Sequence, residues 1–362
     1  MFVAFRDLMF AKGRFALMGT VVVLITLLVG LLSGLTAGLA RENVSAVTSL
    51  PADRIAFAAP GGDQELSYAD STVTEAQWRQ WAGAPGVRGA EPLGIVTTRA
   101  TADDRSTGVS VFGVEPGSGL PPDGARVDDR TVVMSTGAAD ALGVRAGDTV
   151  LLAGRRLTVA ATGGDASFSH TPVVWTSLRT WRTIAPPAGA ADGPTATVIV
   201  LDTASGADLA ATDRAAGTRT VTKADSLSAI GSYASENGSL QLMRGFLFAI
   251  SALVVGAFFT VWTIQRSGDI AVLKALGATT AGLLRDALGQ AVVLLTGGTL
   301  AGSAAAAAIG AAVAGSAVPF VLTPATVLVP AAVMVLLGVL GAALAVRRIT
   351  SVDPLTALGS AR

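Results

Sequence analysis

The sequence predicts an α-helical membrane protein with four transmembrane helices and a mixed α/β extracytoplasmic domain inserted between helices 1 and 2. Three observations predict this class. Of the 362 residues, 51% are hydrophobic and only 14% are charged, whereas a soluble domain carries about 25% charged residues. Several charge-free stretches are long enough to cross a bilayer core, which needs about 20 apolar residues. A long polar segment separates the first of these stretches from the others.

The charge-free stretches define the spans. Residues 15–40 and 245–265 each fit one helix. A signal peptide has an apolar region of about 7–15 residues, so the longer first stretch favours an uncleaved anchor over a cleaved signal. Residues 287–346 are too long for one helix across a core of about 30 Å. Proline ends or kinks a helix, and three prolines divide this last stretch into two spans: Pro319, Pro324 and Pro330.

Basic residues beside the spans predict the orientation, because cytoplasmic flanks carry an excess of Lys and Arg. Both termini and the loop between the second and third spans are expected to face the cytoplasm. The flanking residues are Arg6, Lys12, Arg14, Arg266, Lys274, Arg285, Arg347, Arg348 and Arg362.

These boundaries divide the chain into nine segments. They are a cytoplasmic segment (1–14), helix 1 (15–40), the extracytoplasmic α/β domain (41–244), helix 2 (245–265), a cytoplasmic loop (266–286), helix 3 (287–317), an outer hairpin (318–324), helix 4 (325–346) and a cytoplasmic tail (347–362).

The extracytoplasmic segment is long enough to form its own core. Alternating or apolar runs predict strands at 94–100, 109–114, 131–134, 149–153, 157–161, 171–175 and 195–201. Short helices are predicted at 75–81 and 138–142, and 144–162 is predicted to be a β-hairpin that turns near Gly154.

The cytoplasmic loop is predicted to contain a short amphipathic helix at 269–277. Ile270, Leu273 and Leu276 share one face, Asp269 lies at the helix start and Lys274 further along, as the helix dipole favours, and Gly277 is a C-terminal stop. Such a helix either lies in the lipid headgroups or docks in a groove of a partner. Periodicity alone leaves both open.

Several kinds of chemistry are excluded. The chain has no cysteine, so disulfides and thiolate sites are excluded. A P-loop requires Gly-Lys followed by Ser or Thr, and no lysine follows a glycine, so ATP hydrolysis by that route is excluded. The HExxH and GxSxG motifs are also absent, so an enzyme is not expected. The single histidine, His170, lacks the partners of a typical zinc site. Net charge near zero predicts no nucleic-acid partner, and helices 2–4 lack the charged residues of an ion pathway.

The span order and two cytoplasmic motifs, DIAVLKALGA at 269–278 and VDPLTALG at 352–359, resemble the MacB/FtsX-like ABC permease family. This resemblance implies a homodimer in the bacterial plasma membrane, bound to a separate ATPase subunit that alone binds ATP and drives a lever-type mechanism. It also implies that the loop helix is the coupling helix that contacts the ATPase, through Asp269, Ile270, Leu273, Lys274, Leu276 and Gly277.

Three further segments, LSGLTAGLARENVS at 32–45, SHTPVV at 169–174 and SYASENGSLQLM at 232–243, resemble the haem-efflux permeases of Gram-positive bacteria. The resemblance implies that haem is the transported ligand, with no permanently bound cofactor and no metal site beyond the haem iron.

Haem is flat and apolar with two propionates, so a capture site needs an apolar slot, an iron ligand and a cation. Glu236 and Met243 are seven residues apart and therefore share a helical face, and Tyr233 and Arg244 lie on or near it. Met and Tyr are known haem ligands. Arg41 and Glu42 lie at the outer end of the first span. We hypothesise that haem lies between the first two spans, near the dimer axis, with Glu236 and Met243 on the iron side and Arg41 or Arg244 at the propionates.

Simpler roles compete with these assignments. Glu236 can cap a helix N-terminus, Met243 can pack as an ordinary side chain, and Arg41 and Arg244 can anchor in headgroups. Gly30, Gly34 and Gly38 form a GxxxGxxxG pattern, which favours close packing against another helix, within the chain or across a dimer.

Two other functions fit the same architecture. One is a permease for another amphiphile, such as a lipid, lipopeptide or antibiotic. The other is a transmembrane signalling protein that transports nothing.

Overall fold

The computed structural model describes residues 12–185, 196–265, 268, 272, 276–277, 279–313 and 318–350. The chain divides into two compact units. The membrane unit comprises Met1–Gly38 and Ser239–Arg362, and the outer unit comprises Leu39–Gly238.

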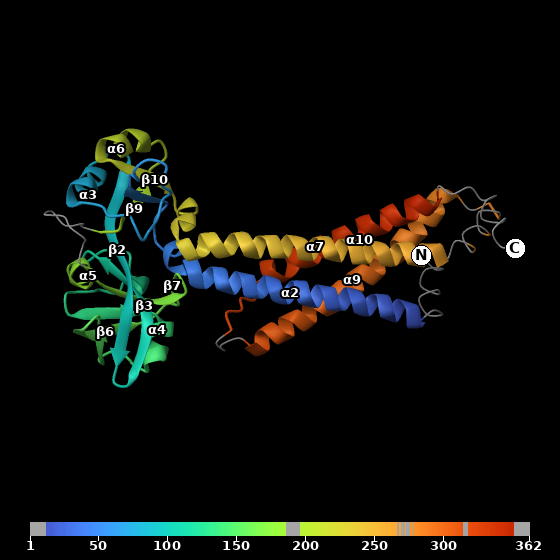
Figure 1. The fold of residues 1–362 in the computed structure, drawn as a ribbon, viewed down its shortest axis with the longest axis horizontal. Helices are drawn as coiled ribbons and strands as arrows, with labels where there is room; N and C mark the ends of the chain where they lie inside the picture. Colours follow the sequence, from blue (N-terminus) through green and yellow to red (C-terminus); the bar gives the residue numbers. More distant parts are fainter. Residues whose placement is uncertain are drawn as a thin grey trace. The chain divides into compact units, whose positions relative to one another are not determined.

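The apolar stretches of the sequence form four long helices (Figure 1): α2 (Lys12–Thr48), α7 (Gly231–Gln265), α9 (Thr280–Val313) and α10 (Pro324–Thr350). Each contains a segment long and apolar enough to span a membrane, which agrees with the predicted fold class.

Two of these helices extend well beyond the charge-free stretches. Helix α2 has 37 residues and α7 has 35, so each is about 50 Å long at 1.5 Å per residue. A bilayer core of about 30 Å covers only part of that length. Residues 41–48 and 231–244 therefore continue the helices of the first two spans.

The membrane helices share one apolar core. Its residues come from all four helices, and they are Met18, Val22, Val255, Phe259, Ala291, Leu295 and Ala342. Pro324 is the first residue of α10, where a missing N–H is tolerated.

The small residues of the GxxxGxxxG pattern are used within the chain. A Cβ on Gly30 would lie 2.9 Å from the Ala306 Cβ, and a Cβ on Gly34 would lie 2.2 Å from the Phe320 ring. A Cβ on Gly38 would overlap the carbonyl of Pro319. These glycines thus allow α9 and the segment after it to approach α2 closely.

The outer unit contains ten described strands in one connected sheet. They are β1 (Arg54–Ala58), β2 (Val87–Ala102), β3 (Arg105–Val114), β4 (Thr131–Met134), β5 (Thr149–Leu152), β6 (Arg155–Thr162), β7 (Ser167–Phe168), β8 (Thr171–Ser177), β9 (Val198–Thr203) and β10 (Thr218–Thr222). The helices are α3 (Glu75–Ala82), α4 (Thr136–Leu142), α5 (Leu178–Ile184) and α6 (Leu209–Ala216), with 3₁₀ turns η1 (Pro122–Gly124) and η2 (Asp225–Ala229).

The long strand β2 joins two sheet regions. Its first half pairs with β9, which continues through β1 to β10. Its second half pairs with β3 and also with β5. Because β3 leads through β8, β4 and β6 back to β5, the strands close into a ring.

A pair of glycines lets α5 pack on this ring. Gly94 and Gly113 are opposite each other in the β2–β3 register. A Cβ on either would lie 2.3 Å from an atom of Trp181. The absence of side chains at both positions thus creates the space for the Trp181 side chain, which is 4% exposed.

The predicted local elements of the outer unit are confirmed, although β2 and β3 begin seven and four residues before their predicted starts. The seven predicted strands correspond to β2, β3, β4, β5, β6, β8 and β9, and the two helices to α3 and α4. Strands β5 and β6 form the predicted hairpin, in which Ala153 and Gly154 have positive φ. Residue 195, the start of the last predicted strand, lies outside the described residues.

Candidate functional site

A two-residue hairpin tip lies at the centre of the candidate site. Ser169 and His170 connect β7 to β8 and have φ values of 49° and 61°. Two successive positive φ values are typical of the tight turn that matches the twist of a hairpin. They cost energy for residues other than glycine, so contacts around the tip must hold it.

An aromatic cluster anchors the base of this hairpin. Phe168 packs edge-on against Tyr68 and Phe112, with ring centroids 5.5 and 5.6 Å apart. The Thr171 hydroxyl donates to the Phe168 carbonyl at 2.8 Å and lies 2.6 Å from the Ser110 hydroxyl. The hairpin is therefore fixed to strand β3.

The tip contacts helix α2 through its backbone. The Ser169 N–H donates to the Asn43 carbonyl at 3.0 Å, and the His170 N–H donates to the Glu42 carbonyl at 3.2 Å. In the strand before the tip, the Ser167 N–H donates to the hydroxyl of Ser45 on α2 at 2.8 Å. These bonds hold the hairpin tip against helix α2.

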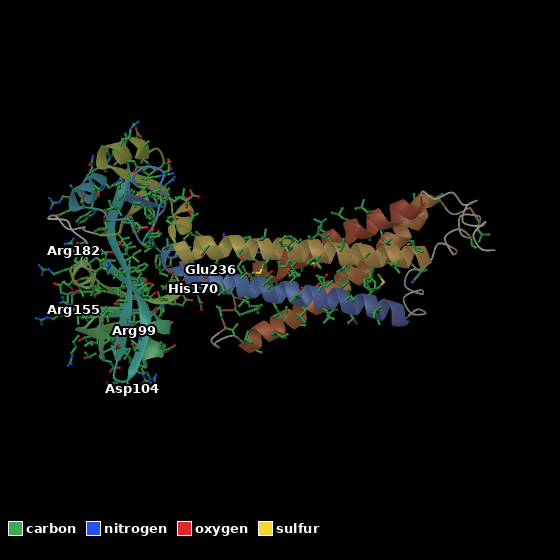
Figure 2. The ribbon with its side chains drawn as sticks, viewed as in Figure 1. Arg99, Asp104, Arg155, His170, Arg182 and Glu236 are labelled. Carbon is green, nitrogen blue, oxygen red and sulfur yellow. The ribbon has the colours of Figure 1, made fainter. Side chains whose placement is uncertain are left out.

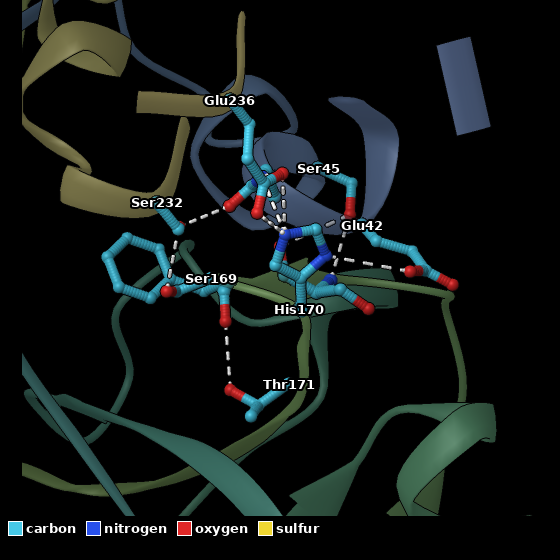
Figure 3. A network of polar contacts seen from close by, with 10 residues as sticks. Glu42, Ser45, Ser169, His170, Thr171, Ser232 and Glu236 are labelled. Carbon is cyan, nitrogen blue, oxygen red and sulfur yellow. Dashed lines mark hydrogen bonds and ion pairs between the residues drawn. The ribbon is translucent and has the colours of Figure 1, made fainter. Parts of the chain in front are cut away.

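Three polar side chains from three elements converge at this point, and Figures 2 and 3 label two of them, His170 and Glu236. The His170 Nε2 atom lies 2.9 Å from both carboxylate oxygens of Glu236 on α7. The Asn43 amide nitrogen lies 2.9 Å from Glu236 Oε2 and also 2.9 Å from His170 Nε2. Asn43 is 1% exposed, and its Oδ1 accepts a hydrogen bond from Ser232.

Donor and acceptor chemistry assigns the protons in this triangle. A carboxylate only accepts hydrogen bonds, and the amide nitrogen only donates. Glu236 accepts both hydrogen bonds when Asn43 Nδ2 donates one and His170, in the tautomer with hydrogen on Nε2, donates the other. The Asn43–His170 approach is then a close contact rather than a hydrogen bond.

A second carboxylate faces the other side of the imidazole. Glu42 Oε2 lies 3.7 Å from His170 Nδ1. The side chains of His170, Glu42 and Glu236 are 30%, 45% and 40% exposed, so the cluster is open to solvent. The hydroxyls of Ser169 and Ser232, 2.9 Å apart, extend the network.

The remaining candidate haem residues have other surroundings. Arg41 forms an exposed ion pair with Asp165, and Tyr233 packs against the outer unit's apolar cluster around Phe57 and Phe168. Met243 and Arg244 belong to the membrane unit, where Met243 is 47% exposed and Arg244 is partly buried.

Most of the candidate coupling residues lie outside the described residues. These are Asp269, Ile270, Leu273 and Lys274. The described Leu276 is 79% exposed, and Gly277 has a φ of 91°, a conformation that glycine adopts readily at helix ends.

The sequence interpretation selected Glu42 and Glu236 as site residues but missed His170 and Asn43, which contact Glu236. It also missed Ser169 and Ser232, which extend the network through Asn43. The signal was present, because the three segments 32–45, 169–174 and 232–243 each contribute to the network. No group of three or more metal-binding side chains is found among the described residues. In the cluster, Asn43 Nδ2 and His170 Nε2 each lie 2.9 Å from the Glu236 carboxylate.

Comparisons with known proteins agree with this architecture. Residues 15–219 match the family described as MacB-like periplasmic core domain, and residues 242–354 match the FtsX-like permease C-terminal family. A relative from Staphylococcus haemolyticus, "Putative hemin transport system permease protein HrtB", is 24% identical over 361 residues, 98% of each chain. The "Uncharacterized ABC transporter permease Rv2563" of Mycobacterium tuberculosis is 26% identical over 377 residues, 99% of each chain.

Among solved structures, the extracellular domain of the ABC-type transporter YknZ from Gram-positive bacteria aligns with a TM-score of 0.36 and 16% identity, covering 47% of this chain and 98% of that chain. The two family matches together extend over both units. The chain therefore belongs to the MacB/FtsX-like family of ABC transporter permeases, as a non-catalytic multi-pass membrane subunit with an extracytoplasmic domain and a partner ATPase.

Proposed function

We propose that this permease exports haem that has partitioned into the membrane. The observation that carries the proposal is the relative named as a hemin transport permease, which aligns over 98% of both chains. At 24% identity the likeness supports the architecture more strongly than the cargo, so the distribution of apolar and charged groups provides the second argument.

The outer unit offers little surface to an apolar ligand. Within its described part, Leu151 is the only exposed large hydrophobic side chain, at 40%. Helix α7 differs, because Leu242, Met243 and Phe246 are 63%, 47% and 60% exposed. A flat apolar cargo that enters from the bilayer would therefore contact the helices first.

Exposed apolar residues occur on every lipid-facing helix, so exposure alone does not select a site. Helix α7 adds the required chemistry, since it carries Glu236, Met243 and Arg244. Seven residues correspond to about 10 Å along a helix and nearly two turns, so Glu236 and Met243 face the same side. We assign them as candidate iron ligands, with Tyr233 and Glu42 as further contacts and Arg41 or Arg244 as candidate propionate partners.

The mechanism follows from the family architecture. Two copies of the chain would form the permease, with the loop 266–286 seated on the ATPase and both termini in the cytoplasm. ATP binding would draw the cytoplasmic helix ends together, and the long helices α2 and α7 would transmit the movement outward as levers. No continuous pore is required.

Topology is testable because the chain has no natural cysteine. Single cysteines at the exposed positions Asp104 and Leu276 are labelled with a membrane-impermeant maleimide. Asp104→Cys should react in intact cells and Leu276→Cys only after permeabilisation. Protection of Asp104→Cys in intact cells would contradict the proposed orientation.

The cargo is tested by deleting the gene and measuring growth in haemin. Increased haemin sensitivity that the intact chain restores, together with haemin binding by the purified permease, supports haem export. Sensitivity to a different amphiphile with unchanged haemin tolerance would indicate another cargo. Unchanged tolerance to all amphiphiles, with altered signalling outside the cell, would indicate a non-transporting role.

A further inference from the structure

We propose that Asn43 and His170 are positioning residues that hold the Glu236 carboxylate in the orientation needed to meet a ligand. The inference rests on the proposed function, in which Glu236 is a candidate iron ligand. All three residues belong to the outer unit, so the carboxylate and the donors that hold it lie within one unit.

Asn43 is well suited to fix another group. It is 1% exposed, and Ser232 donates to its Oδ1, so the amide cannot turn without losing a bond. This leaves the Nδ2 group aimed at Glu236 Oε2 at 2.9 Å. Because the amide is already buried and oriented, it loses little further conformational entropy when it bonds to the carboxylate.

His170 is fixed from its backbone. Its N–H is bonded to the Glu42 carbonyl, and its φ of 61° is set by the two-residue turn. The Nε2 atom of the imidazole is equidistant from the two carboxylate oxygens of Glu236, 2.9 Å from each. Glu42, 3.7 Å from Nδ1, favours the orientation in which the ring lies between the two carboxylates.

The carboxylate keeps capacity for a ligand. Its two oxygens together offer about four lone-pair sites, of which Asn43 and His170 use the side that faces them. The Glu236 side chain is 40% exposed, so its other edge is accessible. Donors behind a ligating group orient it, and their loss typically reduces metal affinity about 10- to 100-fold.

A purely structural role for His170 can be separated from this one. Ser45 also seats the hairpin on α2, since its hydroxyl accepts from the Ser167 N–H at 2.8 Å and donates to the Ser167 carbonyl at 3.3 Å. No contact between Ser45 and Glu236 is found among the described hydrogen bonds. Ser45→Ala is therefore the matched control for hairpin seating.

The experiment is a haemin titration of the full chain in lipid nanodiscs, followed by the Soret band. Asn43→Ala and His170→Phe should each weaken haemin binding about 10-fold or more and shift the Soret band in the same direction as Glu236→Ala. His170→Gln retains an N–H donor and should restore part of the affinity. Ser45→Ala should leave both readouts unchanged, and thermal unfolding confirms that each variant is folded.

The outcomes separate this inference from the proposed function. A Soret band that changes in Glu236→Ala but not in the Asn43 and His170 variants rejects the positioning roles alone. Equal effects of Ser45→Ala and His170→Phe reject them in favour of hairpin seating. Haemin binding that is insensitive to Glu236→Ala rejects Glu236 as a ligand and with it the positioning roles, while haem remains the cargo. Absence of haemin binding by the unaltered chain rejects the whole site.

Discussion

His170 and Glu236 are 66 residues apart in the sequence, yet the imidazole Nε2 lies 2.9 Å from both carboxylate oxygens. One residue belongs to a hairpin tip and the other to helix α7. Asn43 of α2 bonds to the same carboxylate, so three segments meet in one hydrogen-bonded cluster.

Replacement of Asn43 by alanine should destabilise the outer unit. The change removes a buried side chain that donates to the Glu236 carboxylate and accepts from Ser232, and a hydrogen bond to a charged group contributes about 1.5–3 kcal/mol. Thermal unfolding of the full chain measures the loss. Ser235→Ala is the control, since the Ser235 hydroxyl bonds within its own helix to the Ser232 carbonyl at 3.0 Å; equal stability of both variants would show that the network contributes nothing.

Met243→Ala should weaken haemin binding without loss of stability. The side chain is 47% exposed, so its removal leaves no cavity, whereas a thioether ligand to iron would be lost. Haemin titration gives the affinity and the Soret position. The control is Leu253→Ala on the same helix, a side chain that is 73% exposed, and an identical response from the two variants would show that the sulfur is not a ligand.

Gly34→Ala should loosen the packing of the segment that contains Phe320 on helix α2. The new methyl group would lie 2.2 Å from the Phe320 ring, and overpacking typically costs about 1–3 kcal/mol. Phe320→Ala should recover part of the loss in the double variant, because the clash is removed. Thermal unfolding in nanodiscs measures these changes in stability. Gly289→Ala is the control, because no atom lies within 4 Å of its new Cβ. Additive effects of Gly34→Ala and Phe320→Ala in the double variant would contradict the contact.

Gly94→Ala should destabilise the strand ring of the outer unit. The added Cβ would lie 2.3 Å from the Trp181 ring, which is packed and has little room to move, so we expect about 1–3 kcal/mol of destabilisation. Gly119→Ala, where no atom lies within 4 Å of the new Cβ, should change little. Chemical denaturation followed by tryptophan fluorescence compares them, and similar midpoints would refute the close packing of Trp181.

The outer unit should lose stability at alkaline pH through Tyr68. Burial raises the pKa of the Tyr68 phenol, an effect that the hydrogen bond from Tyr68 to the Ser226 hydroxyl only partly offsets. The unfolded chain therefore releases this proton at lower pH than the folded chain, and stability falls as pH rises above the ordinary tyrosine value of about 10.

Tyr68→Phe removes this titration. Relative to the unaltered chain, the variant should lose less stability between pH 8 and pH 11, as measured by denaturant midpoints at each pH. Parallel losses in the two proteins would mean that Tyr68 does not contribute to the pH dependence.

Local pattern was sufficient for much of the fold. Charge-free stretches predicted four long apolar helices, because lipid tolerates few charged side chains. Alternation predicted seven strands of the outer unit, since a half-buried strand must place apolar residues on one face. Strands β1 (Arg54–Ala58), β7 (Ser167–Phe168) and β10 (Thr218–Thr222) were missed. Length alone is not the reason for β1 and β10, because the four-residue strands β4 and β5 were predicted.

The sequence by itself therefore determined the membrane class, the insertion of an α/β domain between the first two helices, and the family to which the chain belongs. Only the tertiary structure decided that β2 pairs with β5 to close the ring of strands and that the Phe320 ring packs against Gly34. It also decided that Asn43 and His170 bond to the Glu236 carboxylate. The reason is physical: periodicity records which face of one element is buried. The distances between atoms of segments far apart in the chain are set by side-chain packing and by the pairing of polar groups.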